Sequence, residues 1–285
     1  GAADFSGGIA ARYLRVFWLL AISHAFSLTC LLLFGLTFHE VLPHGNVLVW
    51  GLCAGVAGGL ALLCFYQALA LGDMGATAAI SGLLSAALPV LFTLATIGAP
   101  TRRQLLGFGL AAAAIWLIST QPEKSKSGIA RTPLARRRLS FAIISGIGFG
   151  IFFIALRLAN SGGLIWPLAA SRVASMSVAV CGGLVFSRKH FTVSRNEASS
   201  PDAIRARAPW KEGVALAVLA AICDTAGNVL FVAATRTGRL DIAAVLASLY
   251  PASTILLAAW LLNERTSARQ AAGMAAALVA VALIS

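Results

Sequence analysis

Charged residues are scarce in this chain, and acidic ones are scarcest. Only 11% of the 285 residues are charged, with 10 Asp and Glu beside 22 Lys and Arg, whereas about 25% are charged in a typical soluble protein. So little charge excludes a soluble globular domain. The net charge of +12 would suit a nucleic-acid-binding protein, but the basic residues lie between long apolar runs, as in membrane proteins. We therefore expect the lipid bilayer, and no nucleic acid, as a partner.

Metal-binding and redox motifs are also lacking. The cysteines lie singly in apolar runs and form no CxxC pair; they are Cys30, Cys53, Cys64, Cys181 and Cys223. Such cysteines act as small apolar side chains. His39, Glu40 and His44 resemble a zinc-protease motif, but Pro43 intervenes and the histidines are not four residues apart on one helical face. The sequence predicts no metal, no cofactor and no catalytic site.

Long apolar runs fill most of the chain, and 59% of the residues are hydrophobic. A run of about 20 residues crosses a bilayer, and a helix satisfies its own backbone there. We expect ten such spans, near 1–11, 14–37, 47–71, 74–98, 102–120, 139–159, 165–186, 212–235, 240–262 and 267–285. The first is too short to cross. Because the sequence starts at Gly1 without methionine, we expect this helix to be truncated. We expect no signal peptide, because no basic region precedes an apolar stretch here.

The sequence also repeats itself. Residues 65–119 align without a gap with 231–285 at an offset of 166, and matching pairs include Phe65/Phe231, Gly72/Gly238 and Gly107/Gly273. Earlier segments align at offsets of 145 (1–12 with 146–157) and 148, which places His24 opposite Arg172. Repeats inside a membrane protein are typical of secondary transporters, whose substrate site lies between the halves.

The repeat predicts the organisation of the chain. We expect a first repeat at 1–120, a basic connecting loop at 121–138 and a second repeat at 139–285. An odd number of spans per repeat inserts the second one upside down, so the predicted fold is an all-α membrane protein with ten transmembrane helices in two inverted five-helix repeats. Basic residues of 121–138 and 187–211 predict that these stretches are cytoplasmic and the C-terminus external. The expected location is the inner (plasma) membrane, crossed many times.

Short motifs of the second repeat resemble the EamA-like repeats of the drug/metabolite transporter superfamily. They are Arg239-Leu240-Asp241, Ala247-Ser248-Leu249-Tyr250-Pro251, Asn263-Glu264-Arg265 and Gly273. The first repeat departs from this pattern, with Ser85 at the position of Pro251 and Gly98 at that of Glu264. The resemblance implies a transporter, commonly a proton-coupled exporter of amino acids, other metabolites or toxic compounds. It also implies that both termini are cytoplasmic, which conflicts with the charge pattern.

Two carboxylates are candidates for proton coupling. An ionisable side chain within a span is costly unless it faces a cavity or a partner. Asp224 lies near the middle of its span, and Asp4 lies in the incomplete first helix. We assign proton coupling to both. The alternative is that each carboxylate is structural and accepts hydrogen bonds from a neighbouring helix.

Five further residues are candidates for substrate binding: His24, Tyr66, Gln67, Arg172 and Asn228. Arg172 has the geometry to hold a carboxylate through two hydrogen bonds, although it would equally pair with Asp224 or Asp4 or extend to the membrane surface. His24 suits a proton relay or an ordinary hydrogen bond between helices. Tyr66 and Gln67 either line the cavity or join helices, and Asn228 follows Asp224 by one helical turn.

Other residues have structural interpretations. Glycines spaced four apart allow close helix contact; they are Gly51, Gly55, Gly59, Gly146 and Gly150. Prolines should kink three spans, at Pro89, Pro167 and Pro251. Acidic residues should cap helices or complement their dipoles, at Asp73, Asp241 and Glu264. The fifth and tenth spans have few polar residues and should form a scaffold or a homodimer surface.

We therefore expect a secondary active transporter that moves small metabolites, amino acids or drugs by alternating access. A channel or lipid scramblase is the main rival, since a repeat does not exclude flux without coupling. An intramembrane enzyme is a weaker rival. It needs a nucleophile and base, or metal ligands, at one depth, and His24 is the only histidine within the apolar runs.

Overall fold

A computed structural model describes residues 1–43, 45–70, 74–119, 133–188, 210–261 and 267–284 of the chain. All regular elements in these ranges are helices: α1 (Ala2–Tyr13), α2 (Val16–Thr37), α3 (Asn46–Ala70), α4 (Met74–Thr96), α5 (Arg102–Ser119), α6 (Pro133–Leu158), η2 (Ala159–Gly162), α7 (Ile165–Arg188), α9 (Trp210–Thr237), α10 (Leu240–Ser248), α11 (Tyr250–Leu261) and α12 (Ala268–Ile284). The prediction of an all-α protein is confirmed for this part of the chain.

Six of these helices are long and apolar enough to cross a membrane: α2, α3, α4, α6, α7 and α9. Large apolar side chains cover their outside, and Trp18, Phe34 and Leu230 each expose more than half of their surface. In water such a surface would be unfavourable, whereas lipid tails solvate it. The protein is therefore a multi-pass membrane protein. The other predicted spans correspond to shorter stretches, α1, α5, α10 with α11, and α12.

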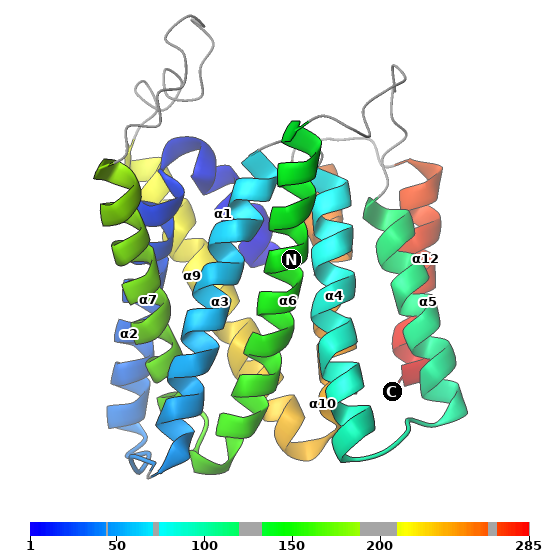
Figure 1. Ribbon diagram of the computed structural model, residues 1–285, viewed down its shortest axis with the longest axis horizontal. Coiled ribbons are helices and arrows are strands. Elements are labelled where there is room, and N and C mark those ends of the chain that lie inside the picture. The colour runs from blue at the N-terminus through cyan, green and yellow to red at the C-terminus, as the bar shows by residue number, and fades with distance from the viewer. Residues whose placement is uncertain (44, 71–73, 120–132, 189–209, 262–266, 285) are drawn as a thin grey trace, which may run out of the picture.

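The helices form a bundle of roughly parallel rods with alternating directions along the chain, in which α3, α4, α6 and α7 lie in front of α9 and α10 (Figure 1). α6 begins and α7 ends at one end of the bundle, which we call the basic end because Arg136, Arg137 and Arg138 lie in the first turns of α6. The predicted loop at 121–138 is thus too long, since α6 starts at Pro133. The connections from α2 to α3, α4 to α5, α6 to α7 and α9 to α10 lie at the opposite end (Figure 1).

Helices from the two halves of the sequence pack against each other. α3 contacts α6 and α7, whereas α9 contacts α1 and α2; α4 contacts α10, and α5 contacts α12. The α5–α12 contact is reciprocal. A methyl group on Gly107 would lie 2.6 Å from Ile284, and one on Gly273 would lie 2.7 Å from Ile118. Since these residues are matched at the offset of 166, each helix presents the same surface to the other, as in an isologous interface.

The predicted close contacts at glycines are confirmed. Gly51, Gly55 and Gly59 form a stripe on α3 that lies against Pro167, Ser171 and Ser175 of α7. Added methyl groups would lie 2.7 Å from the Pro167 carbonyl oxygen and 2.8 Å from Ser175 Oγ, and at Gly55 the Ser171 carbonyl oxygen would be closer still. Gly146 and Gly150 of α6 lie in the same way against α4. Small residues bring the backbones together because lipid supplies no hydrophobic force between helices.

The three prolines behave differently from one another. Pro251 fits the predicted interruption, because the ninth span breaks at Leu249 into α10 and α11. Pro89 lies inside α4, which continues through it as one helix. Pro167 is the third residue of α7, where the backbone N–H has no partner within the helix, so proline costs little there. The predicted kink at Pro167 is therefore wrong, since only two residues of the helix precede it.

Asp241 is not the N-cap residue of α10, so the predicted cap is wrong. Its carboxylate nevertheless lies in the first turn, where it complements the helix dipole and accepts a 3.0 Å hydrogen bond from the Ile242 backbone N–H. Arg239 is the N-cap residue, while Asp241 lies inside the helix and is fully buried. The Arg239 Nη2 atom lies 2.9 Å from Asp241 Oδ2 and also donates a hydrogen bond of 3.0 Å to the Gly98 carbonyl oxygen. A buried carboxylate needs such a partner, and the pair ties the end of α4 to the start of α10. Asp73 and Glu264 lie outside the described residues.

We predict that Gly55→Ala destabilises the protein, because the new methyl group meets a backbone oxygen that cannot move without separating α3 from α7. Overpacking of this kind costs about 1–3 kcal/mol. The measurement is the melting temperature of detergent-solubilised protein, followed by size-exclusion chromatography. Gly109→Ala is the matched control, since nothing lies within 4 Å of its added methyl group. Equal melting temperatures for the two variants would contradict the predicted contact.

Candidate functional site

A cavity of about 270 Å³ lies between the two halves of the helix bundle. Its walls come from α1, α2, α3, α4, α6, α7, α9 and α10, together with Tyr250 at the start of α11. Predicted site residues that line it are Asp4, His24, Arg172, Asp224 and Asn228. The helical packing thus brings together residues that are up to 220 positions apart in the sequence (Asp224 − Asp4).

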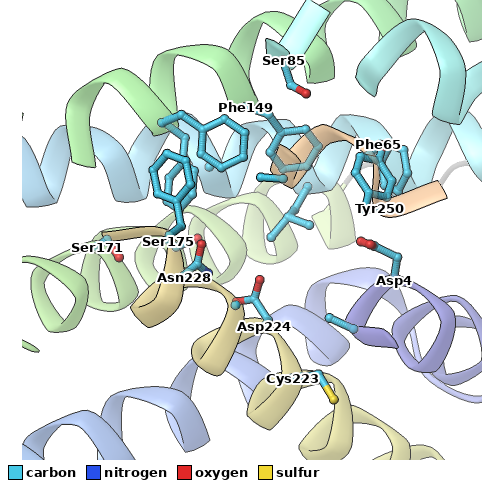
Figure 2. A pocket seen from close by; sticks show the side chains of 18 of the residues that line it. Asp4, Phe65, Ser85, Phe149, Ser171, Ser175, Cys223, Asp224, Asn228 and Tyr250 are labelled. Carbon is cyan, nitrogen blue, oxygen red and sulfur yellow. The ribbon is translucent and has the colours of Figure 1, made fainter. Parts of the chain in front are cut away.

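The polar groups lie mainly on one side of the cavity. Asp4 projects from α1, and Asp224 and Asn228 project from α9. Figure 2 shows Asp4 and Asp224 pointing into the pocket from these two helices, which pack side by side. The Asp4 side chain is 27% exposed and Asp224 39% exposed, so both carboxylates are accessible from the cavity. We call Asp4, Asp224 and Asn228 the acidic wall.

Asp224 forms an ion pair with Arg172 of α7. Arg172 Nη2 lies 2.7 Å from Asp224 Oδ2. The guanidinium is nearly inaccessible, with 4% of the side chain exposed, and its Nε and Nη2 atoms have no hydrogen bond of good geometry. The contact is therefore an electrostatic pairing more than an aligned hydrogen bond. Because a buried unpaired charge is very unfavourable, the Asp224 carboxylate stabilises the buried Arg172 guanidinium by neutralising its charge.

His24 supports Arg172 from the other side. Its Nδ1 atom lies 3.4 Å from Arg172 Nη1, and its Nε2 atom lies 3.2 Å from Ser175 Oγ. Arginine only donates hydrogen bonds, so Nδ1 is the acceptor and the ring proton is assigned to Nε2, which donates to Ser175. His24 is 3% exposed. Both ring nitrogens are thus engaged in holding Arg172 in place between α2 and α7.

The other side of the cavity is aromatic. Phe65 from α3 and Phe149, Phe152 and Phe153 from α6 line it, and we call these four residues the aromatic wall. Phe65 contacts Phe149 edge-on at a centroid distance of 5.9 Å. Figure 2 shows Phe65 and Phe149 across the pocket from Asp4 and Asp224. The cavity is therefore acidic on one side and apolar on the other.

Sequence reasoning missed the aromatic wall. The signal was present, because Phe149, Phe152 and Phe153 recur three and four residues apart and so share a helical face. A row of phenylalanines in an apolar span is usually lipid-facing or core, so the pattern alone did not indicate a cavity. Ser85 and Ser248 were missed too; their hydroxyl groups lie 3.0 Å apart at the cavity wall.

Two predicted binding residues lie away from the cavity lining. Tyr66 is buried, and its hydroxyl lies against Gly7 of α1. Gln67 is exposed on the outside of α3. Neither is among the residues that line the cavity. The reason is helical geometry: Phe65 faces the cavity, and its two successors point about 100° and 200° away from it around a helix of 3.6 residues per turn.

The described residues hold no group of three or more His, Cys, Asp or Glu side chains positioned to bind a metal ion. What the cavity offers is an ion pair, two accessible carboxylates and a set of aromatic rings within membrane-spanning helices. Such a site can bind a small organic molecule, and each carboxylate can exchange a proton.

Comparison with known proteins agrees with this arrangement. Residues 136–285 match the EamA-like transporter family. The chain belongs to the EamA-like transporter family. The matched region covers α6 to α12, which includes Arg172, Asp224 and Asn228. The resemblance seen in the motifs of the second repeat is therefore confirmed.

A similarity in fold to a solved structure extends over nearly the whole chain. A protein solved by crystallography has the same fold, with a TM-score of 0.69 and 17% sequence identity over 99% of this chain and 93% of the other. At this identity the similarity concerns the fold alone. The comparison with curated proteins found no match.

We predict that the effects of substitutions at Arg172 and Asp224 are not additive. Asp224→Asn leaves a buried guanidinium without its counter-ion, whereas Arg172→Met leaves a carboxylate that faces the cavity. Asp224→Asn should therefore lower the melting temperature more. The double variant should recover part of that loss, with a coupling of about 0.5–3 kcal/mol. Thermal melting of the purified variants measures this, and strictly additive shifts would show that the two side chains do not interact.

Proposed function

We propose that this EamA-like protein is a proton-coupled secondary transporter that exports small organic molecules by alternating access. The observation that carries the proposal is the Arg172–Asp224 ion pair at the wall of a cavity within the membrane-spanning helices. Ionisable residues in that position commonly mark substrate and proton pathways. The family match supports transport, and the proposal adds coupling, direction and mechanism.

Contacts between matched residues support two inverted five-helix repeats. His24 and Arg172 are matched at the offset of 148 and touch each other. Gly82 and Ser248 are matched at the offset of 166, and a methyl group on Gly82 would lie 3.4 Å from the Ser248 carbonyl oxygen. In a two-fold arrangement, a residue touches its own mate only near the axis. The reciprocal α5–α12 contact fits the same axis, and ten spans follow if α1, α5, α10–α11 and α12 also cross.

Polar contacts join the two halves at the end opposite the basic end. The Glu40 carboxylate accepts hydrogen bonds from the backbone N–H groups of Leu164 and Ile165 at the start of α7. Trp166 Nε1 donates a 2.8 Å hydrogen bond back to the Glu40 carbonyl oxygen. With the Arg239–Gly98 contact, these bonds close that end, and alternating access requires that they break. The positive-inside rule makes the closed end external in a bacterial-type inner membrane.

Proton coupling follows from competition for Asp224. The carboxylate has one strong partner, Arg172, and a surface that faces the cavity. A proton or a bound ligand that takes the place of Arg172 changes the contact between α7 and α9. In this proposal Asp224 carries the proton, Asp4 provides a second carboxylate, and His24 keeps Arg172 positioned. A channel or scramblase would need none of these pairings, so coupling is what distinguishes the alternatives.

We predict that Asp224→Asn abolishes proton-coupled transport. The full-length protein in proteoliposomes would be challenged with amino acids, polyamines, nucleosides and cationic drugs under an imposed pH gradient. Solid-supported-membrane electrophysiology then measures substrate-dependent, saturable currents. Wild-type protein should give a current that depends on the gradient. The variant should give none, because an amide cannot exchange a proton.

Glu212→Gln is the matched control, because Glu212 is an exposed carboxylate in the first turn of the same helix. This variant should behave like wild type. Radiolabel counterflow checks that the Asp224→Asn protein still binds and exchanges substrate. Gradient-driven uptake that survives in Asp224→Asn would refute the proton-carrier assignment, and unsaturable flux in wild type would favour a channel or scramblase.

A further inference from the structure

The helices on opposite sides of the cavity are repeat mates, and several of their matched lining positions differ in chemistry, although Phe65 and its mate Phe231 are both aromatic. Continuing the offset of 166 along α3 and α9 matches Gly58 with Asp224 and Leu62 with Asn228, and all four residues line the cavity. The continuation is supported by a pair of matching contacts. Thr225 Oγ1 donates to Ser27 Oγ at 2.7 Å, and their mates Gly59 and Ser175 also touch, since a methyl group on Gly59 would lie 2.8 Å from Ser175 Oγ. At these two matched positions α9 carries polar side chains, whereas α3 carries Gly58, which has only a hydrogen atom, and the apolar Leu62.

The same exchange occurs between α1 and α6. At the offset of 145, Asp4 of α1 matches Phe149 of α6, and both line the cavity. Gly8 of α1 likewise matches Phe153 of α6. α1 packs on α9, and α3 packs on α6. The fold is thus symmetric, but one helix pair provides the acidic wall and the matched pair provides the aromatic wall.

The exposed surface of the acidic wall is anionic despite the presence of Arg172. The Asp224 side chain is 39% exposed, while the Arg172 side chain behind it is only 4% exposed. A ligand in the cavity therefore meets the carboxylates of Asp224 and Asp4 before it meets the guanidinium. His24 is engaged by Arg172 and Ser175, and the Gly1 amino group lies 2.9 Å from Asp4 Oδ2. Apart from this amino group and the buried Arg172, the described lining presents no cationic group to balance the two carboxylates.

The aromatic wall favours the same type of ligand. Phenylalanine rings bind flat apolar groups through stacked or edge-on contacts. Their faces also attract cations. A carboxylate or phosphate facing these rings and two aspartates would be repelled and would lose its hydration without compensation.

We propose that the transported ligand is an amphipathic organic cation, with an ammonium group on the acidic wall and an aromatic or bulky apolar body on the aromatic wall. This inference rests on the proposed transport function and specifies its substrate class. The ammonium group pairs with Asp4 and with the exposed face of Asp224, and the body of the ligand covers Phe149 and its neighbours. Recognition therefore requires both a positive charge and an apolar body in one molecule.

Four probes that share parts of one skeleton test this. Phenethylamine carries the aromatic body and an ammonium group, 3-phenylpropionate carries the body and a carboxylate, phenylalanine carries both charges, and ethylamine lacks the body. Ligand-detected NMR titration of the full chain in nanodiscs measures the affinities at neutral pH and fixed salt. We expect phenethylamine to bind at least about tenfold more tightly than each of the others.

Two variants then separate the walls. Asp4→Asn should weaken phenethylamine and ethylamine alike, by about tenfold, since both lose the carboxylate. Phe149→Ala should weaken phenethylamine by about five- to tenfold and leave ethylamine unchanged, and Phe149→Tyr should restore binding. A general loss of folding would not produce this ligand-dependent pattern. Thr29→Ala is the control, because Thr29 is exposed and bonds only within its own helix.

The outcomes distinguish this inference from the proposed function. Stronger binding of 3-phenylpropionate than of phenethylamine would overturn the cation assignment. Tighter binding of phenylalanine than of phenethylamine would show that Arg172 is open to a carboxylate, and would also overturn the cation assignment. Absence of binding by all four probes to folded protein would overturn it too. If phenethylamine binds as expected while Asp224→Asn retains coupled transport, the substrate class stands and the proton-coupling proposal fails.

Discussion

The structure depends on the requirement that a charge within a membrane-spanning bundle has a partner. Arg172 is buried between α2 and α7, where an isolated guanidinium would be very unfavourable. Asp224 on α9 neutralises it at 2.7 Å, and His24 on α2 holds it from the other side. These three residues connect three helices around the cavity. Any event that takes Asp224 away from Arg172 must therefore be compensated by another contact, which makes this pair a natural point of control.

Close packing around this pair is what leaves a cavity of limited size. Gly51, Gly55 and Gly59 bring α3 against α7, so Arg172 is enclosed while the neighbouring face of α3 borders the cavity. The two halves are joined by Glu40 and Arg239 at one end of the bundle. A transporter needs such a combination, with rigid helix pairs that move as units and polar contacts that open and close.

Much of the fold was predictable because its causes are local. Long apolar runs require helices in lipid, and glycines four residues apart indicate close contacts, as at Gly55. Arg172 and Asp224 were recognisable because a charged side chain in an apolar run is costly unless it faces a partner or a cavity. The aromatic wall was not recognisable, since Phe149 in an apolar helix looks the same whether it faces lipid, core or cavity. The roles of Asp241 and Gln67 likewise depend on which way a helix face points, which only the packed bundle decides.

The central claim is that Asp224 exchanges Arg172 for a proton or a ligand during transport. Infrared difference spectroscopy of the protein in lipid tests this most directly, because it detects the carbonyl band of a protonated carboxyl group. The account predicts a band that appears on acidification, is absent in Asp224→Asn, and is diminished when a bound ligand occupies the carboxylate. A spectrum in which no carboxyl band depends on Asp224 at any pH or ligand concentration would contradict the account.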